Sequence, residues 1–179
     1  MKLVILDRDG TINYDSPQHI KSPDEWVPIP GSLEAIALLN QSGFRVVLAT
    51  NQSGISRGLF DMATLNAIHD KMHRALGQLG GRIDALFYCP HAADSDCGCR
   101  KPKAGMYDEI SSRFGVDLTG VPSVGDSLRD LQAGLAYSVQ PILVRTGKGE
   151  ATLAQGNLPD NTWVCAHLAE AVQRIIAEC

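Results

Sequence analysis

Five short apolar runs recur along the chain, each about as long as a β-strand. Within each run the apolar residues are continuous rather than alternating with polar ones. Continuous runs are typical of parallel strands that are covered on both faces. The pattern predicts strands at residues 3–6, 44–49, 85–88, 121–124 and 141–144.

Amphipathic patterns with helical spacing lie between and after these runs. The longest follows Asp61, a residue type favoured at a helix N-cap, and carries apolar residues every three or four positions as far as Leu79. Another ends at Gly115, which is typical of a helix C-terminus. The pattern predicts helices at residues 32–41, 62–79, 105–115, 128–136 and 167–179.

Strands and helices alternate throughout, which predicts an α/β fold with a mostly parallel sheet and right-handed connections. The chain of 179 residues fits one domain and shows no internal repeat or linker, so we expect a single domain over residues 1–179. Two long stretches, 13–30 and 89–103, have no predicted helix or strand. Loops of this length in a compact domain are usually functional.

Composition narrows the classes of partner and location. Hydrophobic residues make up 44% of the chain and charged residues 20%, as in soluble globular proteins. A net charge of -4 argues against nucleic acid or an anionic membrane as the main partner. The N-terminus lacks the apolar region and cleavage site of a secretory signal, and no run approaches the ~20 apolar residues that span a bilayer. We therefore expect a cytoplasmic protein, and we expect a monomer because no heptad pattern is present.

Three polar clusters follow predicted strands: "DRDGT" at 7–11, "TNQSG" at 50–54 and "GDSLRD" at 125–130. Taken singly, each has a simpler interpretation, because Asp-Gly pairs form turns and Thr-Asn or Gly-Asp pairs often precede helices. Ligands of open α/β sheets bind beyond the carboxyl ends of the strands, and parallel strands place all three clusters at that edge. Their joint occurrence therefore predicts one shared site.

The residue types in these clusters suit phosphoryl transfer. Asp7 and Asp126 are hard oxygen ligands of the kind that Mg²⁺ prefers, and an aspartate held there can attack phosphorus to form an aspartyl-phosphate. We predict Asp7 as the nucleophile and Asp9 as the general acid and base. Thr50 offers a hydroxyl and an N–H to a phosphate oxygen, and Lys101 supplies a fixed positive charge.

The stretches "DRDGT", "VVLATN", "RKPK" and "VGDSLRD" resemble the four motifs of the haloacid dehalogenase superfamily of phosphatases, in the same order. The resemblance implies a Rossmann-like three-layer sandwich and Mg²⁺ dependence. It also implies a role for Asp130, which either belongs to the site or only caps a helix. Many members insert a cap domain, but the space between these motifs leaves no room for one, so loops are expected to shield the site. The resemblance assigns catalysis to Asp7, Asp9, Thr50 and Lys101, and Mg²⁺ to Asp7, Asp9 and Asp126.

The segment "CPHAADSDCGCRKPK" holds three of the five cysteines and leads directly into Arg100 and Lys101. Three thiolates and one imidazole form the closed ligand set of a structural zinc site, which would hold the loop 89–99 and both basic side chains in place. The alternatives are a redox pair or a coincidental cluster. A reducing cytoplasm and the strained geometry of a Cys-x-Cys disulfide favour zinc. The predicted Zn²⁺ ligands are Cys89, His91, Cys97 and Cys99.

Two zinc-bearing branches of the superfamily carry such a segment: the heptose-bisphosphate branch, which serves bacterial lipopolysaccharide and related glycans, and the histidinol-phosphate branch of histidine biosynthesis. "TNQSGISRG" and "LVRTGKG" look like the heptose branch, whereas the short zinc loop is common in the other. A non-catalytic phospho-ligand module is a third hypothesis, but such a module could lose Asp7 or Asp9, and both are present. The heptose resemblance implies sugar or distal-phosphate contacts from Asp15, Asn51, Gln52, Ser53 and Arg100, and it leaves Arg57 as a solvated loop residue.

Overall fold

The computed structural model describes residues 1–179 and contains one six-stranded sheet in the order β3-β2-β1-β4-β5-β6. All neighbouring strands are parallel, so the predicted mostly parallel sheet is confirmed. Five strands match the five apolar runs, but the sequence pattern missed β6 because its three residues are too few to show a period. The strands are β1 (Lys2–Leu6), β2 (Phe44–Asn51), β3 (Ala85–Cys89), β4 (Pro122–Gly125), β5 (Gln140–Val144) and β6 (Trp163–Cys165).

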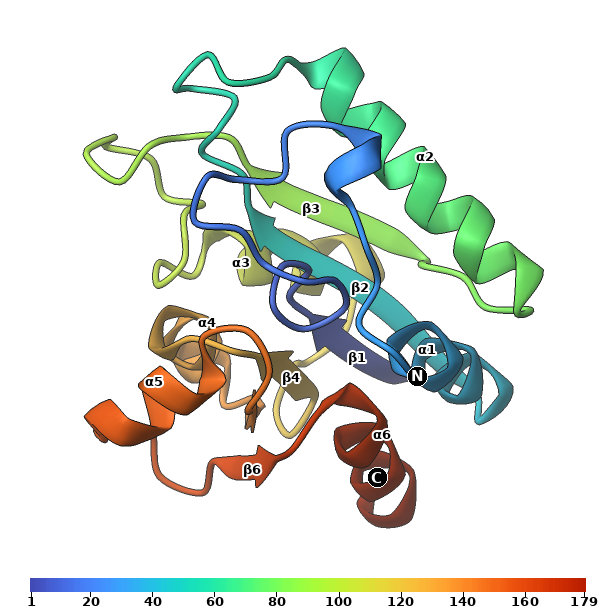
Figure 1. Ribbon diagram of the computed structural model, residues 1–179. Helices are drawn as coiled ribbons and strands as arrows, with labels where there is room; N and C mark the ends of the chain where they lie inside the picture. Colours follow the sequence, from blue (N-terminus) through green and yellow to red (C-terminus); the bar gives the residue numbers. More distant parts are fainter.

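Six α-helices connect and follow the strands (Figure 1). The predicted N-cap is confirmed, since the Asp61 carboxylate accepts from the Thr64 N–H, and Gly115 ends its helix in the left-handed conformation. One helix, α5, was missed because it buries only Gly149 and Thr152 and so has no apolar stripe. The helices are α1 (Ser32–Gln41), α2 (Met62–Gln78), α3 (Gly105–Phe114), α4 (Leu128–Ala133), α5 (Gly149–Gln155) and α6 (Leu168–Glu178), with short 3-10 turns at Pro23–Glu25 and Leu135–Tyr137.

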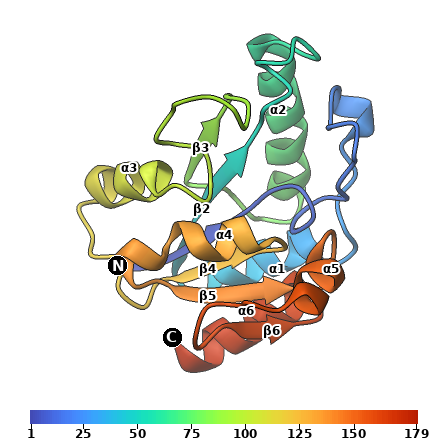
Figure 2. The ribbon, with the colours of Figure 1, turned by 90° about the vertical axis from the view of Figure 1, so that its left-hand side faces the viewer.

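The sheet is the middle of three layers (Figure 2). Alternate residues of each strand point to opposite faces, so Val4 and Leu6 of β1 join one core cluster while Leu3 and Ile5 join the other. The first cluster packs against α1, α2 and α6, and the second packs against α3 and α4. Burial on both faces explains why the strands read as continuous apolar runs.

The strand order reverses direction between β1 and β4. From β1 the chain moves outward through β2 and β3, then returns to add β4 on the other side of β1. The carboxyl ends of these two strands carry Asp7 and Asp126, and the Asp7 N–H donates to the Val124 carbonyl at 2.9 Å. Such a switch point leaves a crevice in which α/β proteins bind ligands.

Both predicted loops lie at this end of the sheet. The 13–30 loop packs inward through Ile20 and Trp26, and Lys71 of α2 donates to the carbonyls of Pro23 and Trp26. The 89–103 loop contains no helix or strand between β3 and α3.

No helix combines the length and the apolar character that crossing a bilayer requires.

Candidate active site

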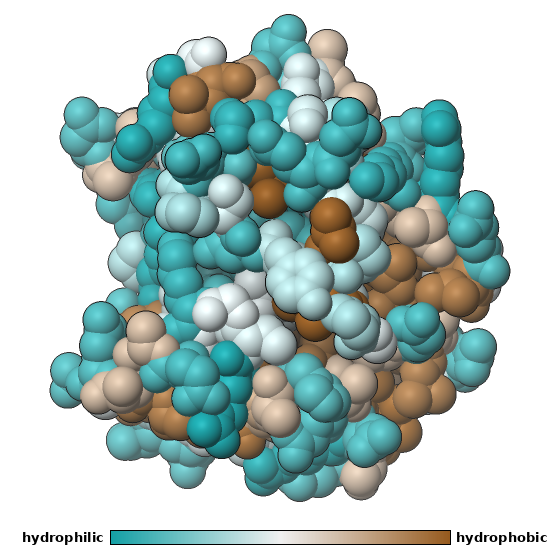
Figure 3. Space-filling view, viewed as in Figure 1, coloured by the Kyte–Doolittle hydropathy of each residue, from teal (hydrophilic) through white to brown (hydrophobic).

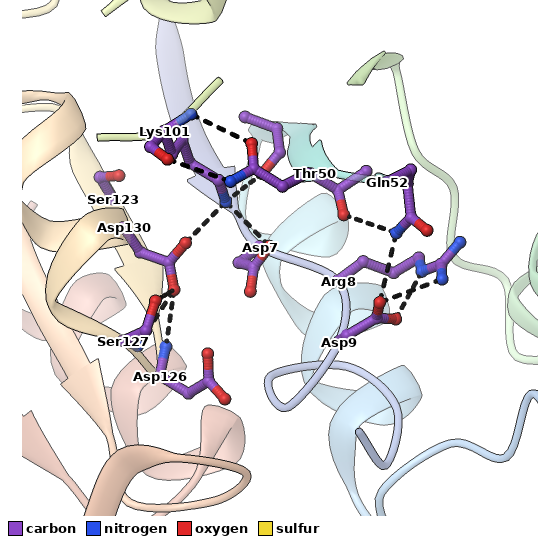
Figure 4. Close-up of polar contacts among 12 residues, drawn as sticks. Asp7, Arg8, Asp9, Thr50, Gln52, Lys101, Ser123, Asp126, Ser127 and Asp130 are labelled. Atoms are coloured by element: carbon purple, nitrogen blue, oxygen red, sulfur yellow. Dashed lines mark hydrogen bonds and ion pairs between the residues drawn. The ribbon is translucent and has the colours of Figure 1, made fainter. Parts of the chain in front are cut away.

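Three carboxylates converge at the switch point. Asp7 follows β1, Asp126 follows β4, and Asp130 lies in the first turn of α4, and an oxygen from each lies within 4.8 Å of the others. Asp130 also closes a capping box, because its Oδ2 accepts from the Ser127 N–H and hydroxyl and from the Asp126 N–H. Figure 4 shows that this cap fixes the segment that carries Asp126. Asp130 is therefore both a cap and a member of the acidic cluster.

Lys101 is the cation of this cluster and is almost fully buried. Its Nζ donates to Asp7 at 2.9 Å and to the Ala49 carbonyl at 2.7 Å, and it lies 2.7 Å from Asp130. Its backbone is held as well, because the Asn51 amide accepts from the Lys101 N–H and donates to the Lys101 carbonyl. The Lys101 side chain, which comes from the 89–103 loop, is thus positioned as rigidly as one on a strand.

The cluster carries more negative charge than Lys101 neutralises. Burial and the neighbouring Asp130 raise the pKa of Asp7 from 3.8 to about 7, and burial and Asp7 raise the pKa of Asp126 from 3.8 to about 8. Burial also disfavours a charged Asp130, but Lys101 and the Ser127 hydroxyl together hold the pKa of Asp130 below its usual value. When ionised, three carboxylates and one ammonium leave two excess negative charges, which is the charge that a divalent cation cancels.

The donor set fits Mg²⁺, because it consists of carboxylate oxygens that surround one point at the base of a crevice. Two glycines make room there. A Cβ at Gly10 or at Gly147 would clash with Oδ2 of Asp126, and both residues have positive φ. The Lys148 N–H donates to the same Asp126 oxygen at 2.8 Å and fixes its orientation.

The Asp9 carboxylate lies outside this group of three carboxylates. Arg8 donates to both of its oxygens, and Gln52 donates to Oδ2 (Figure 4). Asn13 donates to Oδ1. Burial opposes ionisation of Asp9, but Arg8, Asn13 and Gln52 together lower its pKa below 3.8. Asp130 supplies the third carboxylate of that group, and Mg²⁺ binding by Asp9 stays a prediction from the sequence.

Two residues that were expected to contact the substrate, Asn51 and Gln52, form hydrogen bonds with other groups of the protein. Both polar ends of the Asn51 amide bind the Lys101 backbone. The Gln52 amide is buried and donates to Asp9 at 3.2 Å and to the Thr50 hydroxyl at 2.9 Å. Sequence spacing places these side chains at the correct strand end, but it does not show which neighbours take their hydrogen bonds.

A cavity of roughly 230 Å³ opens above the acidic cluster, and none of its lining residues is hydrophobic. The notched, hydrophilic edge of the molecule on the left of Figure 3 lies where the loops after β2 and β3 extend in Figure 1. Asp15, Ser53 and Arg100 line this cavity with Asp7, Asp9, Thr50, Asn51, Lys101, Asp126 and Asp130, as the sequence predicted for the site as a whole.

The cavity rim contains cations that sequence reasoning missed. Arg57 is exposed, as expected, but it also lines the cavity, and so do Arg129 and Lys148. Arg129 follows β4 and Lys148 follows β5, so the rule that ligands bind beyond strand ends could have found both. Lys148 also lies 3.7 Å from Asp15.

The cysteine and histidine cluster fits a tetrahedral metal. A Zn–S distance of about 2.3 Å places tetrahedral ligand atoms about 3.8 Å apart. The Sγ atoms of Cys89 and Cys97 are 3.7 Å apart, and His91 Nδ1 lies 3.4 Å from Cys89 and 3.3 Å from Cys99. The Cys89–Cys99 separation is shorter, at 2.9 Å. All four cysteine and histidine ligands that the sequence predicted are together, and the cluster is compatible with structural zinc.

Comparison with known proteins identifies the family. A model described as "Polynucleotide kinase 3 phosphatase" matches residues 2–127, and one described as HAD-hydrolase-like matches residues 98–171. The D-glycero-beta-D-manno-heptose-1,7-bisphosphate 7-phosphatase of Bordetella bronchiseptica is 62% identical over 178 residues, which cover 99% of each chain. The chain belongs to this family of HAD phosphatases.

Other heptose-bisphosphate phosphatases agree with this assignment. The enzyme of the same name from Pseudomonas putida is 51% identical, with 98% of this chain and all of the relative covered. A crystal structure of D,D-heptose 1,7-bisphosphate phosphatase from B. bronchiseptica, complexed with magnesium and phosphate, has a TM-score of 0.98 and 61% identity and covers both chains completely. The corresponding enzyme from Burkholderia thailandensis has a TM-score of 0.81 and 54% identity, with 99% of this chain and 100% of that one covered. The predicted three-layer fold without a separate cap is confirmed.

Proposed function

We propose that this protein is a Mg²⁺-dependent phosphatase that removes the 7-phosphate of D-glycero-D-manno-heptose 1,7-bisphosphate through an aspartyl-phosphate. The observation that carries the proposal is the convergence of Asp7, Asp126 and Lys101 at the base of a wholly hydrophilic cavity. The relatives with the same fold and with up to 62% identity are named for this reaction.

The proposed chemistry has two steps. In the first, an Asp7 oxygen bonds to phosphorus, the bond from phosphorus to the sugar oxygen breaks, and Asp9 gives its proton to that oxygen. In the second, Asp9 takes a proton from water, the water oxygen bonds to phosphorus, and the bond to Asp7 breaks. The pKa of Asp9 is low in the free protein, which suits the second step; the negative charge of an incoming phosphate raises the pKa of Asp9 for the first.

Other residues hold the transferring phosphate. Asp7 and Asp126, with Asp130 nearby, would bind Mg²⁺, which supplies positive charge to the phosphate oxygens when bound. The buried ammonium of Lys101 contacts Asp7, Asp130 and the Ala49 carbonyl, so it offers a preorganised charge. Thr50 lines the cavity between Asp9 and Lys101 and would contact the same phosphate.

Basic side chains that line the cavity are an argument for a substrate with a second phosphate. Arg57, Arg100 and Arg129 surround the opening, and Lys148 lines it from another element. Arginine binds phosphate through a planar fork, so this rim suits a distal phosphate, while Ser53 and Asp15 offer hydrogen bonds to sugar hydroxyls. A substrate with one phosphate and an ammonium group, such as histidinol phosphate, would place its cation near these basic side chains.

A substrate panel tests the proposal. Both anomers of the heptose bisphosphate, the heptose 1-phosphate and 7-phosphate, and histidinol phosphate are compared by kcat/KM with Mg²⁺ present. We expect a bisphosphate to have the largest value and the product to retain the 1-phosphate. A larger value for histidinol phosphate would reject the heptose assignment, and no turnover of any substrate would favour a phospho-ligand-binding module.

Several further properties belong to the proposal. The single domain over residues 1–179, the cytoplasmic location, the monomeric state and the absence of a nucleic-acid partner stay predictions from the sequence. Zinc at Cys89, His91, Cys97 and Cys99 is proposed as a structural ion that holds the loop leading to Arg100 and Lys101.

A further inference from the structure

Arg8 is a fully buried cation between Asp7 and Asp9, and its side chain points away from the acidic cluster. Its Nε donates to Oδ1 of Asp9 at 2.7 Å, and one terminal nitrogen donates to Oδ2 at 3.2 Å. The guanidinium thus grips both oxygens of the Asp9 carboxylate. A two-point grip fixes the plane of that carboxylate, which a single hydrogen bond does not.

The other terminal nitrogen of Arg8 lies 3.0 Å from Nε2 of His69, a buried residue of α2. A guanidinium can only donate, so Nε2 must accept, and the ring proton must be on Nδ1. Burial, followed by the charge of Arg8, lowers the pKa of His69 to about 3. His69 is therefore neutral and an acceptor at neutral pH.

We propose, on the basis of the proposed function, that Arg8 and His69 are positioning residues that aim the Asp9 carboxylate at the leaving oxygen of the substrate. His69 anchors the far end of the guanidinium, and its helix packs into the main core through Ile68 and Met72. The position of Asp9 is in this way tied to α2, an element that contributes no residue to the cavity lining.

The test compares two leaving groups in order to distinguish a loss of Asp9 orientation from a loss of folded protein. A sugar alkoxide needs a proton from Asp9 to depart, whereas the nitrophenolate of p-nitrophenyl phosphate departs without one. kcat/KM reports the first step, in which the leaving group departs. The ratio of kcat/KM for the heptose bisphosphate to that for p-nitrophenyl phosphate is independent of the folded fraction of a preparation, because both values come from the same protein.

In His69→Leu, which removes the acceptor, we expect this ratio to fall about tenfold or more, because small displacements of an acid cost catalysis steeply. His69→Gln, whose amide oxygen can accept from Arg8, should keep the ratio within about threefold of the wild type. The matched control is His73→Gln, one turn further along the same helix and exposed, which should leave the ratio unchanged. Arg8→Lys keeps the charge and loses the grip, so it should repeat the fall seen with His69→Leu.

Equal losses on both substrates in His69→Leu and Arg8→Lys, or no loss on either, would overturn the proposal and leave the pair a purely structural contact. The wild type alone decides the proposed function. If it prefers another alkyl phosphate, the ratio is measured with that substrate, and the positioning role is tested independently of the heptose assignment.

Discussion

Removing magnesium should make the stability of this protein fall as the pH rises. The perturbation is exchange of the protein into Mg²⁺-free buffer by dialysis, because EDTA would also extract zinc from the cysteine cluster. Without a divalent cation, the electrostatic repulsion between the carboxylates of Asp7 and Asp126 is not compensated. Their pKa values are raised from 3.8 to about 7 and about 8, so the folded protein binds protons that the unfolded chain has already released.

The sign and the size follow from proton linkage. For an acid whose pKa is raised by folding, the free energy of unfolding decreases as the pH climbs from the unfolded to the folded pKa. Between about pH 6.5 and about pH 8.5 the two carboxylates together should cost about 3 kcal/mol. The lowered pKa values of His69 and Asp130 affect stability mainly at lower pH than this window. Hydrogen bonds outweigh burial and lower the pKa of Cys97 from 9.0 to about 6, which raises stability across the window, but equally with and without Mg²⁺.

The assay is urea unfolding followed by circular dichroism at constant ionic strength across this window, with and without Mg²⁺. With saturating Mg²⁺ the contribution of the two carboxylates should disappear, since the cation keeps both of them ionised in the folded protein. Asp126→Asn in Mg²⁺-free buffer is the control and should remove most of the slope. A Mg²⁺-free stability that does not fall relative to the Mg²⁺-saturated stability from about pH 6.5 to about pH 8.5 would refute the excess of buried negative charge.

Three further predictions address single roles. Asp7→Asn should abolish turnover while urea unfolding shows an intact fold, and appreciable residual kcat would remove Asp7 as nucleophile. Cys97→Ser should lose zinc by elemental analysis and lower the melting temperature, whereas unchanged metal content would contradict the zinc site. Gly10→Ala should displace Asp126, because a Cβ at position 10 clashes with the Asp126 carboxylate. The Mg²⁺ concentration needed for half-maximal activity should then rise by about tenfold or more. Gly43→Ala has the same positive φ with open space around it, so an equal effect on Mg²⁺ in that variant would show backbone strain alone to be the cause.

The grouping of the predicted phosphoryl-transfer residues could be inferred from the sequence, because it depends on local pattern and one topological rule. Asp7, Thr50 and Asp126 each end a continuous apolar run, and parallel strands bring such ends to one edge. The zinc ligands were accessible for a similar reason, since all four lie in one short loop and their chemistry admits few partners.

What tertiary structure alone decided is which hydrogen bonds each polar side chain makes. Asn51 was expected to meet substrate, yet it clamps the Lys101 backbone across fifty residues of sequence. Gln52 and Arg8 bind Asp9, and His69 enters from α2 to bind Arg8, although nothing in a helical periodicity separates that histidine from a core residue. Sequence patterns report where a side chain starts along an element, whereas its partner is set by packing between elements that are distant in the chain. The sequence therefore determined the fold class and the place of the chemistry, and the packed structure determined which groups face the substrate and which hold those groups still.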